Sequence, residues 1–338
     1  MDPVSQGALG ALAAASITRN SKVRQGAIIG CAAGMLPDAD IFISSGKDPL
    51  LNLEYHRHFS HALMLIPVGG LICALAFWLL ARRWWKLPFV DIYKCSLAGF
   101  ATAGLLDACT SYGTRLYWPF SDERVAWNLI SIVDPVFTGG MLILLTMAML
   151  RKRPNWARAA LAFVGAYLLL GLVQRERTQD LQRQLAASRG HLSNMRAIVK
   201  PSIGNQVLWR SLYQQGDRFY IDAIRTGLIG APRVYEGVSV PAFRIQALQE
   251  ELPESSVLAR DLDRFHHFSD GFLVWHPEHK DVIGDLRYAA LPQSVKPLWG
   301  IRLKQDAPNE HVSFEAFRSI DAEERKMFMQ MLKGADLP

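Results

Sequence analysis

The feature that most constrains this chain is an apolar run, Ala62–Leu80, that carries no charged side chain. About 20 apolar residues in a helix cross the hydrocarbon core of a bilayer. A charged side chain at that depth is costly, so the absence of any along the whole run favours a membrane helix over the core helix of a soluble protein. The run therefore predicts that the N-terminal part of the chain is a membrane domain.

Other apolar stretches extend this prediction. Three of them are expected to span: Cys95–Leu106 with Ile92 and Tyr93 extending it, Ile132–Leu150, and Trp156–Val173. Two shorter stretches rich in small residues, Val4–Ile17 and Gln25–Leu36, are expected to form a helical hairpin packed against the spanning helices. The expected fold over residues 1–173 is an α-helical membrane domain of about four spanning helices plus this short N-terminal hairpin.

Residues 174–338 have the mixed composition of an ordinary globular domain. The polar stretch Arg175–Ala197 predicts a helix, and Gly284–Ala290 predicts a turn and strand in which Asp285 and Arg287 pair. Strands separated by Gly, Pro and Asp turns are expected at Val207–Tyr213, Arg218–Ile224 and Gly271–Trp275. The second domain is therefore predicted to be a smaller α+β domain.

The basic residues predict how the chain lies in the membrane. Arg and Lys gather beside the apolar runs, within residues 19–24, 82–86 and 151–158. Such clusters are typical of cytoplasmic loops and argue against a nucleic-acid-binding face, despite the net charge of +6. We therefore expect a multi-pass protein of the bacterial inner membrane with residues 19–24 on the cytoplasmic side. Asp38, Asp40 and the residues that follow them up to His61 are expected on the periplasmic side, as are the connection Ala108–Ser131 and the C-terminal domain.

Ionisable residues, most of them of types that bind metals, gather at the predicted outer ends of the helices. They are Asp38 and Asp40 in "LPDADIF", His56, Arg57, His58 and His61 in "HRHFSH", and Asp107 in "LLDACTSYGT". Ionisable groups at this depth usually face a partner or a functional cavity. A mixture of imidazole and carboxylate suits zinc, or else manganese or iron, better than calcium. A metal site is predicted, although a His-Arg cluster at an interface also binds lipid phosphates.

Two further polar residues permit more than one interpretation. Gln6 lies within the first apolar stretch, and Asp134 precedes Pro135 at the start of another. Asp before Pro is as typical of a helix N-cap as of a functional site.

In the C-terminal domain, His266-His267 and the His276-x-x-His279 spacing give weak support for a second metal site.

The motifs "MDPVSQGALGA", "GMLPDADIF", "HRHFSHAL" and "LLDACTSYGTRLYWPFSDERVAWNLISIVDP" together resemble the inner-membrane metal-dependent hydrolase family. These are the YdjM/YbcI-like proteins, also called LexA-binding membrane-associated hydrolases, and the resemblance covers roughly residues 1–150. It implies hydrolysis with metal ligands at Asp38, Asp40, His56, His61 and Asp107. Many relatives carry His where this chain has Gln6, some carry His at the position of Ala103, and Ala62 replaces a Ser. One metal, or a Gln-assisted site, is therefore expected rather than two fully ligated metals.

The resulting hypothesis is a membrane-bound hydrolase that acts at the outer face of the inner membrane on a lipid or lipid-linked (phospho)ester. A bound metal would lower the pKa of a water, Asp40 or Asp107 would act as a general base, and Arg57 would hold an oxyanion or phosphate. The partners are then membrane lipids and a lipid-like substrate, without nucleic acid. Residues expected to support the ligands or contact substrate are Gln6, His58, Ser60, Thr110, Tyr112, Arg115 and Asp134.

Two other functions fit the same residues. A non-catalytic protein could bind metal or lipid headgroups and signal through its periplasmic domain. A small transporter could use the Asp and His residues as an ion path, but it should then carry charges deep inside its helices, and Ala62–Leu80 has none.

Overall fold

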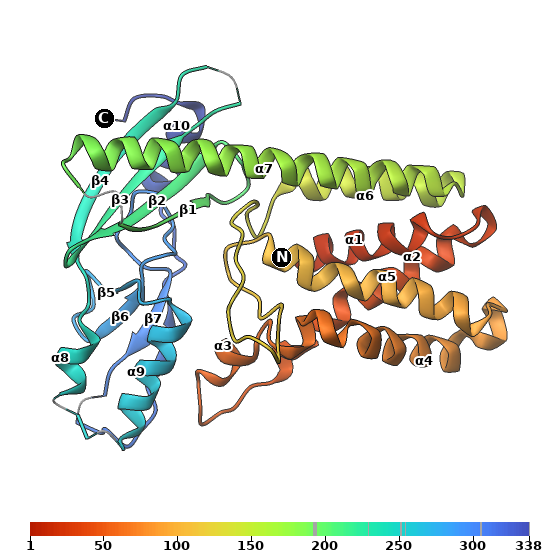
Figure 1. Ribbon diagram of the computed structural model, residues 1–338, viewed down its shortest axis with the longest axis horizontal. Coiled ribbons are helices and arrows are strands. Elements are labelled where there is room, and N and C mark those ends of the chain that lie inside the picture. Colours follow the sequence, from red (N-terminus) through yellow and green to blue (C-terminus); the bar gives the residue numbers. More distant parts are fainter. Residues whose placement is uncertain (192–194, 229, 251, 254, 305, 338) are drawn as a thin grey trace. The chain divides into compact units, whose positions relative to one another are not determined.

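The computed structural model describes residues 1–338 except 192–194, 229, 251, 254, 305 and 338, and the chain in it divides into two units (Figure 1). The first, here called the helical unit, consists of residues 1–42, 55–173 and 203–205. The second, the C-terminal unit, consists of residues 43–54, 174–202 and 206–338. The short segment 43–54 thus belongs to the C-terminal unit although both of its neighbours in sequence belong to the helical unit.

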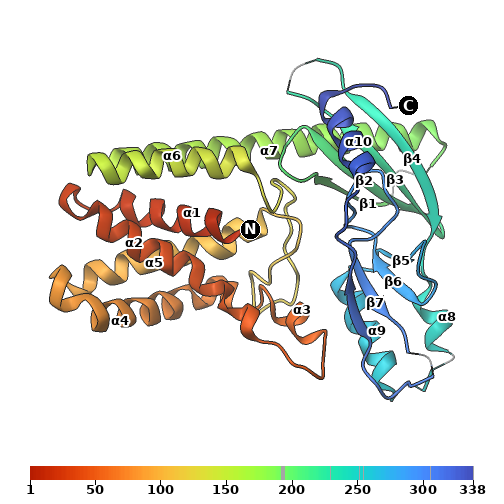
Figure 2. The same ribbon diagram turned by 180° about the vertical axis from the view of Figure 1, so that it is seen from behind.

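The helical unit is built from helices that lie side by side in both views (Figures 1 and 2). They are α1 Pro3–Ser16, α2 Val23–Met35, α4 Ile66–Trp85, α5 Phe89–Ala108, α6 Pro135–Arg151 and the first part of α7 Pro154–Ser188. Short 3₁₀ turns connect them: η1 Asn20–Lys22, η2 Leu36–Phe42, η3 Phe59–His61 and η4 Leu63–Leu65. The expected N-terminal hairpin is present, since α1 packs along α2.

Three segments in the described part of the chain are long and apolar enough to cross a membrane: Leu63–Ala81, Phe89–Ala108 and the helix Pro154–Ser188. The fourth predicted span, Ile132–Leu150, was too long. Its helix, α6, begins only at Pro135 and has 17 residues, because Asp134 caps it and Pro135 occupies its first turn. About three candidate spans, rather than four, therefore follow from length and composition.

The prediction for the segment after Val173 was also partly wrong. A separate helix Arg175–Ala197 was expected, but α7 is one helix of 35 residues that continues to Ser188. No Gly or Pro stands between Val173 and Ser188, so nothing in that sequence stops the helix. It ends before Gly190, whose φ is +75°, and Ala197 lies in the first strand.

The N-terminal helices pack through glycines. A Cβ atom on Gly30 of α2 would lie 2.2 Å from the carbonyl oxygen of Gly10 on α1. A Cβ on Gly99 of α5 would lie 2.4 Å from the carbonyl oxygen of Gly30. The three backbones are thus in direct contact, which only residues without a side chain allow. This packing fixes α2 and α5, whose ends lead into the candidate site.

The C-terminal unit contains two antiparallel sheets of four strands each, with the strands in sequence order. The strands are β1 Arg196–Pro201, β2 Leu208–Gln215, β3 Arg218–Arg225, β4 Arg233–Pro241, β5 Leu273–Trp275, β6 Val282–Asp285, β7 Trp299–Arg302 and β8 Ser313–Ala316. The three strands predicted from the sequence correspond to β2, β3 and β5. The predicted pair also forms, with Arg287 Nη2 donating to Asp285 Oδ2 over 2.7 Å.

Helices cover these sheets. The last part of α7 and α10, Ala322–Lys333, lie on opposite faces of the β1–β4 sheet (Figures 1 and 2). Helices α8 Ile245–Gln249 and α9 Val257–Phe268 lie beside the second sheet. Helix α3 Leu51–Tyr55 is a single turn that begins inside the segment 43–54. Phe219 and Phe272, with ring centroids 5.4 Å apart, join the cores of the two sheets.

Candidate metal centre

His61 is the centre of the group of predicted ligands. Its Nε2 atom lies 3.2 Å from Asp38 Oδ1 and 3.1 Å from Asp107 Oδ2. His61 comes from η3 just before α4, Asp38 from η2 just after α2, and Asp107 from the last turn of α5. Three helix ends therefore bring one imidazole and two carboxylates together, and His61 and Asp107 are buried.

Asp40 contacts the residues on the other side of the His61 ring. Its Oδ2 accepts hydrogen bonds from the Arg57 backbone N–H at 2.8 Å and from Ser60 Oγ at 2.7 Å. Its Oδ1 lies 2.8 Å from His56 Nδ1, and His61 Nδ1 lies 3.0 Å from Ser60 Oγ. A carboxylate that binds one ring nitrogen of a histidine orients the other nitrogen toward a metal. We infer from these contacts that Asp40 and Ser60 turn His61 Nε2 toward Asp38 and Asp107.

The electrostatics of the group favour a cation. Burial alone would lower the pKa of His61, but its contacts with Asp107, Asp38 and Asp40 outweigh burial and raise that pKa to about 10. Burial would raise the pKa of Asp40, but the hydrogen bonds with His56 and His61 outweigh it and lower that pKa below its usual range. The carboxylates thus stabilise positive charge at His61, where a proton and a metal ion would compete.

Arg57 has an unusual backbone conformation that serves this geometry. Its φ is +60°, a left-handed value that is uncommon for a residue with a side chain. Its N–H donates to Asp40, and its carbonyl accepts from the Arg115 N–H at 3.0 Å. The guanidinium is buried, with Nε 3.1 Å from Asp107 Oδ2 and Nη1 donating to Thr110 Oγ1 over 2.9 Å. Such outliers cluster at functional sites, where surrounding contacts hold them in place.

The predicted neighbours divide into two sets. Tyr112 lies beside the ligands, with its ring 4.9 Å from the Arg57 guanidinium and 5.3 Å from the His56 ring. His58 lies in a second set, with its Nε2 2.9 Å from Arg115 Nη1 and its ring 5.7 Å from the Trp118 ring. His58 and Arg115 therefore interact with each other and with the loop after α5 that carries Trp118, and do not contribute to the group of ligands.

Gln6 and Asp134 have different environments. Gln6 is fully buried, and among the described residues neither atom of its side-chain amide has a hydrogen-bond partner. Asp134 is the N-cap of α6, where Oδ1 accepts from the N–H groups of Val136 and Phe137 at 3.1 Å each, and the Tyr167 hydroxyl also donates to it. The N-cap interpretation of Asp134 is confirmed, and its carboxylate is occupied by that role.

The donor atoms fit a divalent metal. Two groups have ligand atoms within 4.8 Å of one another, Asp38 with His61 and Asp107, and Asp38 with Asp40 and His56. Carboxylate oxygens and imidazole nitrogens are the ligands of zinc, manganese and iron sites. Gln6 is a buried amide without a hydrogen-bond partner among the described residues, which is a costly feature. All five predicted ligands belong to these groups, which share Asp38.

Two contacts of this region carry no signal in the sequence. The amino group of Met1 lies against Asp107 Oδ1. The segment 43–54, which connects the Asp38 and His56 motifs, packs in the C-terminal unit. Met1 and Asp107 are far apart in the sequence, and so are the segment 43–54 and the rest of the C-terminal unit. No local spacing or periodicity in the sequence predicts either association.

The C-terminal unit contains two further groups of possible ligands. His276, Glu278 and His279 have ligand atoms within 4.8 Å, but His276 Nδ1 accepts from the Glu278 N–H and Glu278 pairs with Lys296. The other group is Asp48, Asp261 and His311, and the Arg264 guanidinium already supplies its positive charge. In the described part of the chain, His266 and His267 belong to no such group.

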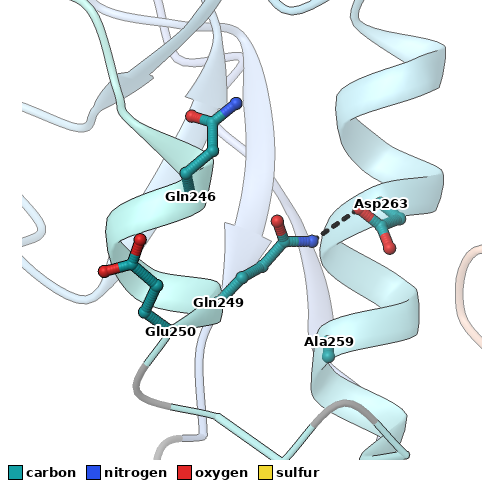
Figure 3. Close-up of a pocket in the computed structure, with 5 residues that line it drawn as sticks. All are labelled: Gln246, Gln249, Glu250, Ala259 and Asp263. Carbon is teal, nitrogen blue, oxygen red and sulfur yellow. Dashed lines mark hydrogen bonds between the residues drawn. The ribbon is translucent and has the colours of Figure 1, made fainter.

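A hollow of about 550 Å³ lies between α8 and α9 (Figure 3). It is lined by Gln246, Gln249, Glu250, Ala259 and Asp263. Gln249 Nε2 donates to Asp263 Oδ1 across it over 2.6 Å. None of the residues predicted for the site lines this hollow.

The chain is similar to a known family of inner membrane proteins. A family model described as YdjM inner membrane protein matches residues 1–178, which include all five predicted ligands. The inner membrane protein YbcI of Escherichia coli (strain K12) is 30% identical over 107 residues, which make up 30% of this chain and 60% of YbcI. The matched region thus spans less than two-thirds of the length of YbcI. No solved structure is significantly similar to the chain.

Proposed function

The chain belongs to the YdjM family of inner membrane proteins, and we propose that it is a membrane-bound, metal-dependent hydrolase of a lipid or lipid-linked ester. One observation carries the proposal. His61 Nε2 faces the carboxylates of Asp38 and Asp107 at 3.2 and 3.1 Å, while Ser60 lies 3.0 Å from the opposite ring nitrogen. A buried imidazole oriented in this way, between two carboxylates, is the arrangement that a metal ligand needs.

Asp38, His61 and Asp107 would hold the metal, with zinc as the first candidate. Asp40 is less available, because its two oxygens already interact with the Arg57 N–H, Ser60 and His56. Asp107 Oδ2 lies near Arg57 Nε and His61 Nε2 but accepts no hydrogen bond among the described residues. We therefore propose one metal at the first group. The second group, which shares Asp38, is where a further ion would bind if the protein takes two.

The chemistry would be divided between the metal and the chain. A bound divalent metal would supply Lewis acidity and lower the pKa of a water molecule. His56 is partly exposed and hydrogen-bonded to the buried Asp40, a His–carboxylate pair suited to moving a proton. The buried Arg57 guanidinium would stabilise negative charge on a phosphate or an ester oxygen.

The substrate class is proposed from the apolar residues near the ligands in sequence. Phe42 is 84% exposed and follows Asp40 by two residues, and Phe120 is 82% exposed in the loop that also carries Tyr112. Exposed aromatic side chains beside apolar helices are typical of a membrane interface. An amphiphile could keep its tail in the bilayer there. The proposed side is the outer face, because Arg and Lys gather in the loops expected to be cytoplasmic.

The test uses the full-length protein purified in detergent. Metal content measured by mass spectrometry should fall sharply in Asp38→Asn and His61→Ala. It should stay at the wild-type level in Asp134→Asn, the matched control at the helix cap. Equal metal content in all four proteins would contradict the metal site.

Catalysis is tested separately on a panel of phospholipids and lipid-linked esters. Metal-dependent turnover should appear in the wild type and disappear in Asp40→Asn and His56→Ala. A metal-loaded wild type that is inert across the panel would instead favour a non-catalytic metal- or lipid-binding membrane protein.

A further inference from the structure

The segment 43–54, here called the connector, links the two motifs that carry most of the proposed ligands. It leaves the helical unit after Phe42 and returns to it at Tyr55. Asp40 lies three residues before the connector, and His56 lies two residues after it. Leu50, in its middle, is only 1% exposed, and the Leu50 N–H donates to Asp48 Oδ1 over 3.0 Å. The connector is therefore a packed part of the C-terminal unit rather than a free loop.

One arginine of α9 holds the connector at two points. Arg264 Nη1 donates to Asp48 Oδ1 over 3.0 Å, and Arg264 Nε and Nη2 donate to Glu54 Oε2 over 3.1 and 2.9 Å. The Arg264 and Asp48 side chains are 20% and 22% exposed, so this pair is better shielded from solvent than an ordinary surface salt bridge, whereas Glu54 is 41% exposed. The planar guanidinium can bind two carboxylates at once, which a lysine ammonium does less well.

The other contacts of Arg264 fix its own position. Arg264 Nη1 donates to Asp261 Oδ1 over 3.1 Å. Asp261 is fully buried, and its second oxygen lies 2.8 Å from His311 Nδ1 and accepts from the Val312 N–H at 3.2 Å. The C-terminal unit thus presents a preorganised cation to the two acidic residues of the connector.

We propose that Arg264 is a positioning residue: by pinning Asp48 and Glu54, it holds the connector so that Asp40 and His56 stay aligned beside the metal ligands. The proposal rests on the proposed function for its metal readout. Its mechanical part does not, because the 2.8 Å contact between His56 Nδ1 and Asp40 and the hydrogen bond from the Arg57 N–H to Asp40 join residues of the chain directly. Loss of the Arg264 contacts would loosen the stretch between Asp40 and His56, although the packing of Leu50 would still restrain it, and would weaken the alignment at both ends.

The test uses full-length protein in detergent and three readouts. Hydrogen exchange is followed in peptides covering residues 43–54, in peptides covering residues 55–61, and in β2 as an internal reference. Zinc affinity is measured by competition with a chromophoric chelator. Arg264→Gln should speed exchange in both of the first two regions and weaken zinc binding roughly tenfold, as mutation of residues that orient metal ligands commonly does.

Three further variants distinguish the loss of the Arg264 contacts from a general loss of folding. Arg260→Gln removes an exposed cation one turn earlier on α9 and should change nothing. Arg264→Lys should restore part of the protection from hydrogen exchange that Arg264→Gln loses, because it keeps the positive charge but not the planar guanidinium. The double variant Asp48→Asn with Glu54→Gln leaves α9 intact and should reproduce the effect of Arg264→Gln even if that variant folds poorly.

The proposal is overturned if exchange in residues 43–54 stays at the wild-type rate in both Arg264→Gln and the double variant. It is equally overturned if that exchange rises while residues 55–61 and zinc affinity are unaffected. A wild-type protein that binds no zinc would refute the proposed function instead, and the exchange in residues 55–61 would then decide the positioning role alone.

Discussion

Replacing Gly30 with alanine should loosen the helical unit. The new Cβ would lie 2.2 Å from the carbonyl oxygen of Gly10 and 2.4 Å from Ala14 Cβ, against at least 3.4 Å for ordinary contact. A backbone carbonyl cannot rotate away, so α1 and α2 must separate by roughly 1 Å. Overpacking of this kind costs about 1–3 kcal/mol, and the better helix propensity of alanine returns about 0.5–1 kcal/mol. We expect the free energy of unfolding to fall by about 1–2 kcal/mol.

The cysteines provide an assay specific to the helical unit. All four, Cys31, Cys73, Cys95 and Cys109, lie in that unit as free thiols, and the last three are buried. A fluorogenic thiol reagent therefore reports the temperature at which this unit opens. At roughly 2–4 °C per kcal/mol for a domain of this size, Gly30→Ala should melt about 2–8 °C below the wild type.

Gly165→Ala on α7 is the matched control. No described atom outside its own helix turn lies within 4 Å of a Cβ built at Gly165, so the same substitution there meets open space. Its melting temperature should equal or slightly exceed that of the wild type. If Gly30→Ala and Gly165→Ala melt together, α1 and α2 do not pack through Gly10 and Gly30, and the scaffold described for the site is wrong.

Two other substitutions test single groups. Asp134→Ala removes the N-cap of α6 and should lower the free energy of unfolding, followed by the thiol assay, by about 1–2 kcal/mol. Metal content measured by mass spectrometry should stay unchanged. A loss of metal would show that Asp134 contributes to the metal site. Lys200 is buried, and burial, with a smaller contribution from Arg287, holds its pKa well below the usual 10.5. The unfolded chain then binds the extra proton, so between the folded pKa and about 10.5 the wild type should gain up to ~1.4 kcal/mol per pH unit relative to Lys200→Met. Denaturant titrations at pH 7 and pH 9 measure this difference, and a constant difference would contradict it.

The gathering of the candidate ligands was predictable because it follows from helix direction. Hydropathy marks where helices cross, and basic loops mark one side, so Asp38, His61 and Asp107 had to lie at the same ends of their helices. Their contacts of 3.1–3.2 Å agree with that reasoning. Which partners each of these side chains binds was not predictable. That Asp40 binds the Arg57 N–H depends on a left-handed backbone at Arg57, which tertiary contacts impose and no spacing in the sequence indicates.

The contacts of Arg264 with the connector could not be predicted from local sequence patterns, for a related reason. Arg264 and Glu54 are 210 residues apart, and pairing over that distance leaves no periodicity to read. Asp48 and Glu54 look like any acidic residues of an exposed loop. Only the buried Leu50 and the fixed guanidinium distinguish the connector from such a loop, and both are properties of the folded C-terminal unit.

The two errors in helix boundaries share one cause. Apolar character was used to locate helix ends, which predicted α6 too long and ended a helix too early at Val173. Ile132 and Val133 are apolar but precede the Asp134-Pro135 start of α6. The residues after Val173 are polar but contain no breaker, so α7 continues to Ser188. Hydropathy reports the surroundings that a side chain prefers, whereas caps, Pro and Gly determine where backbone hydrogen bonding begins and ends. A boundary in one property therefore does not locate a boundary in the other.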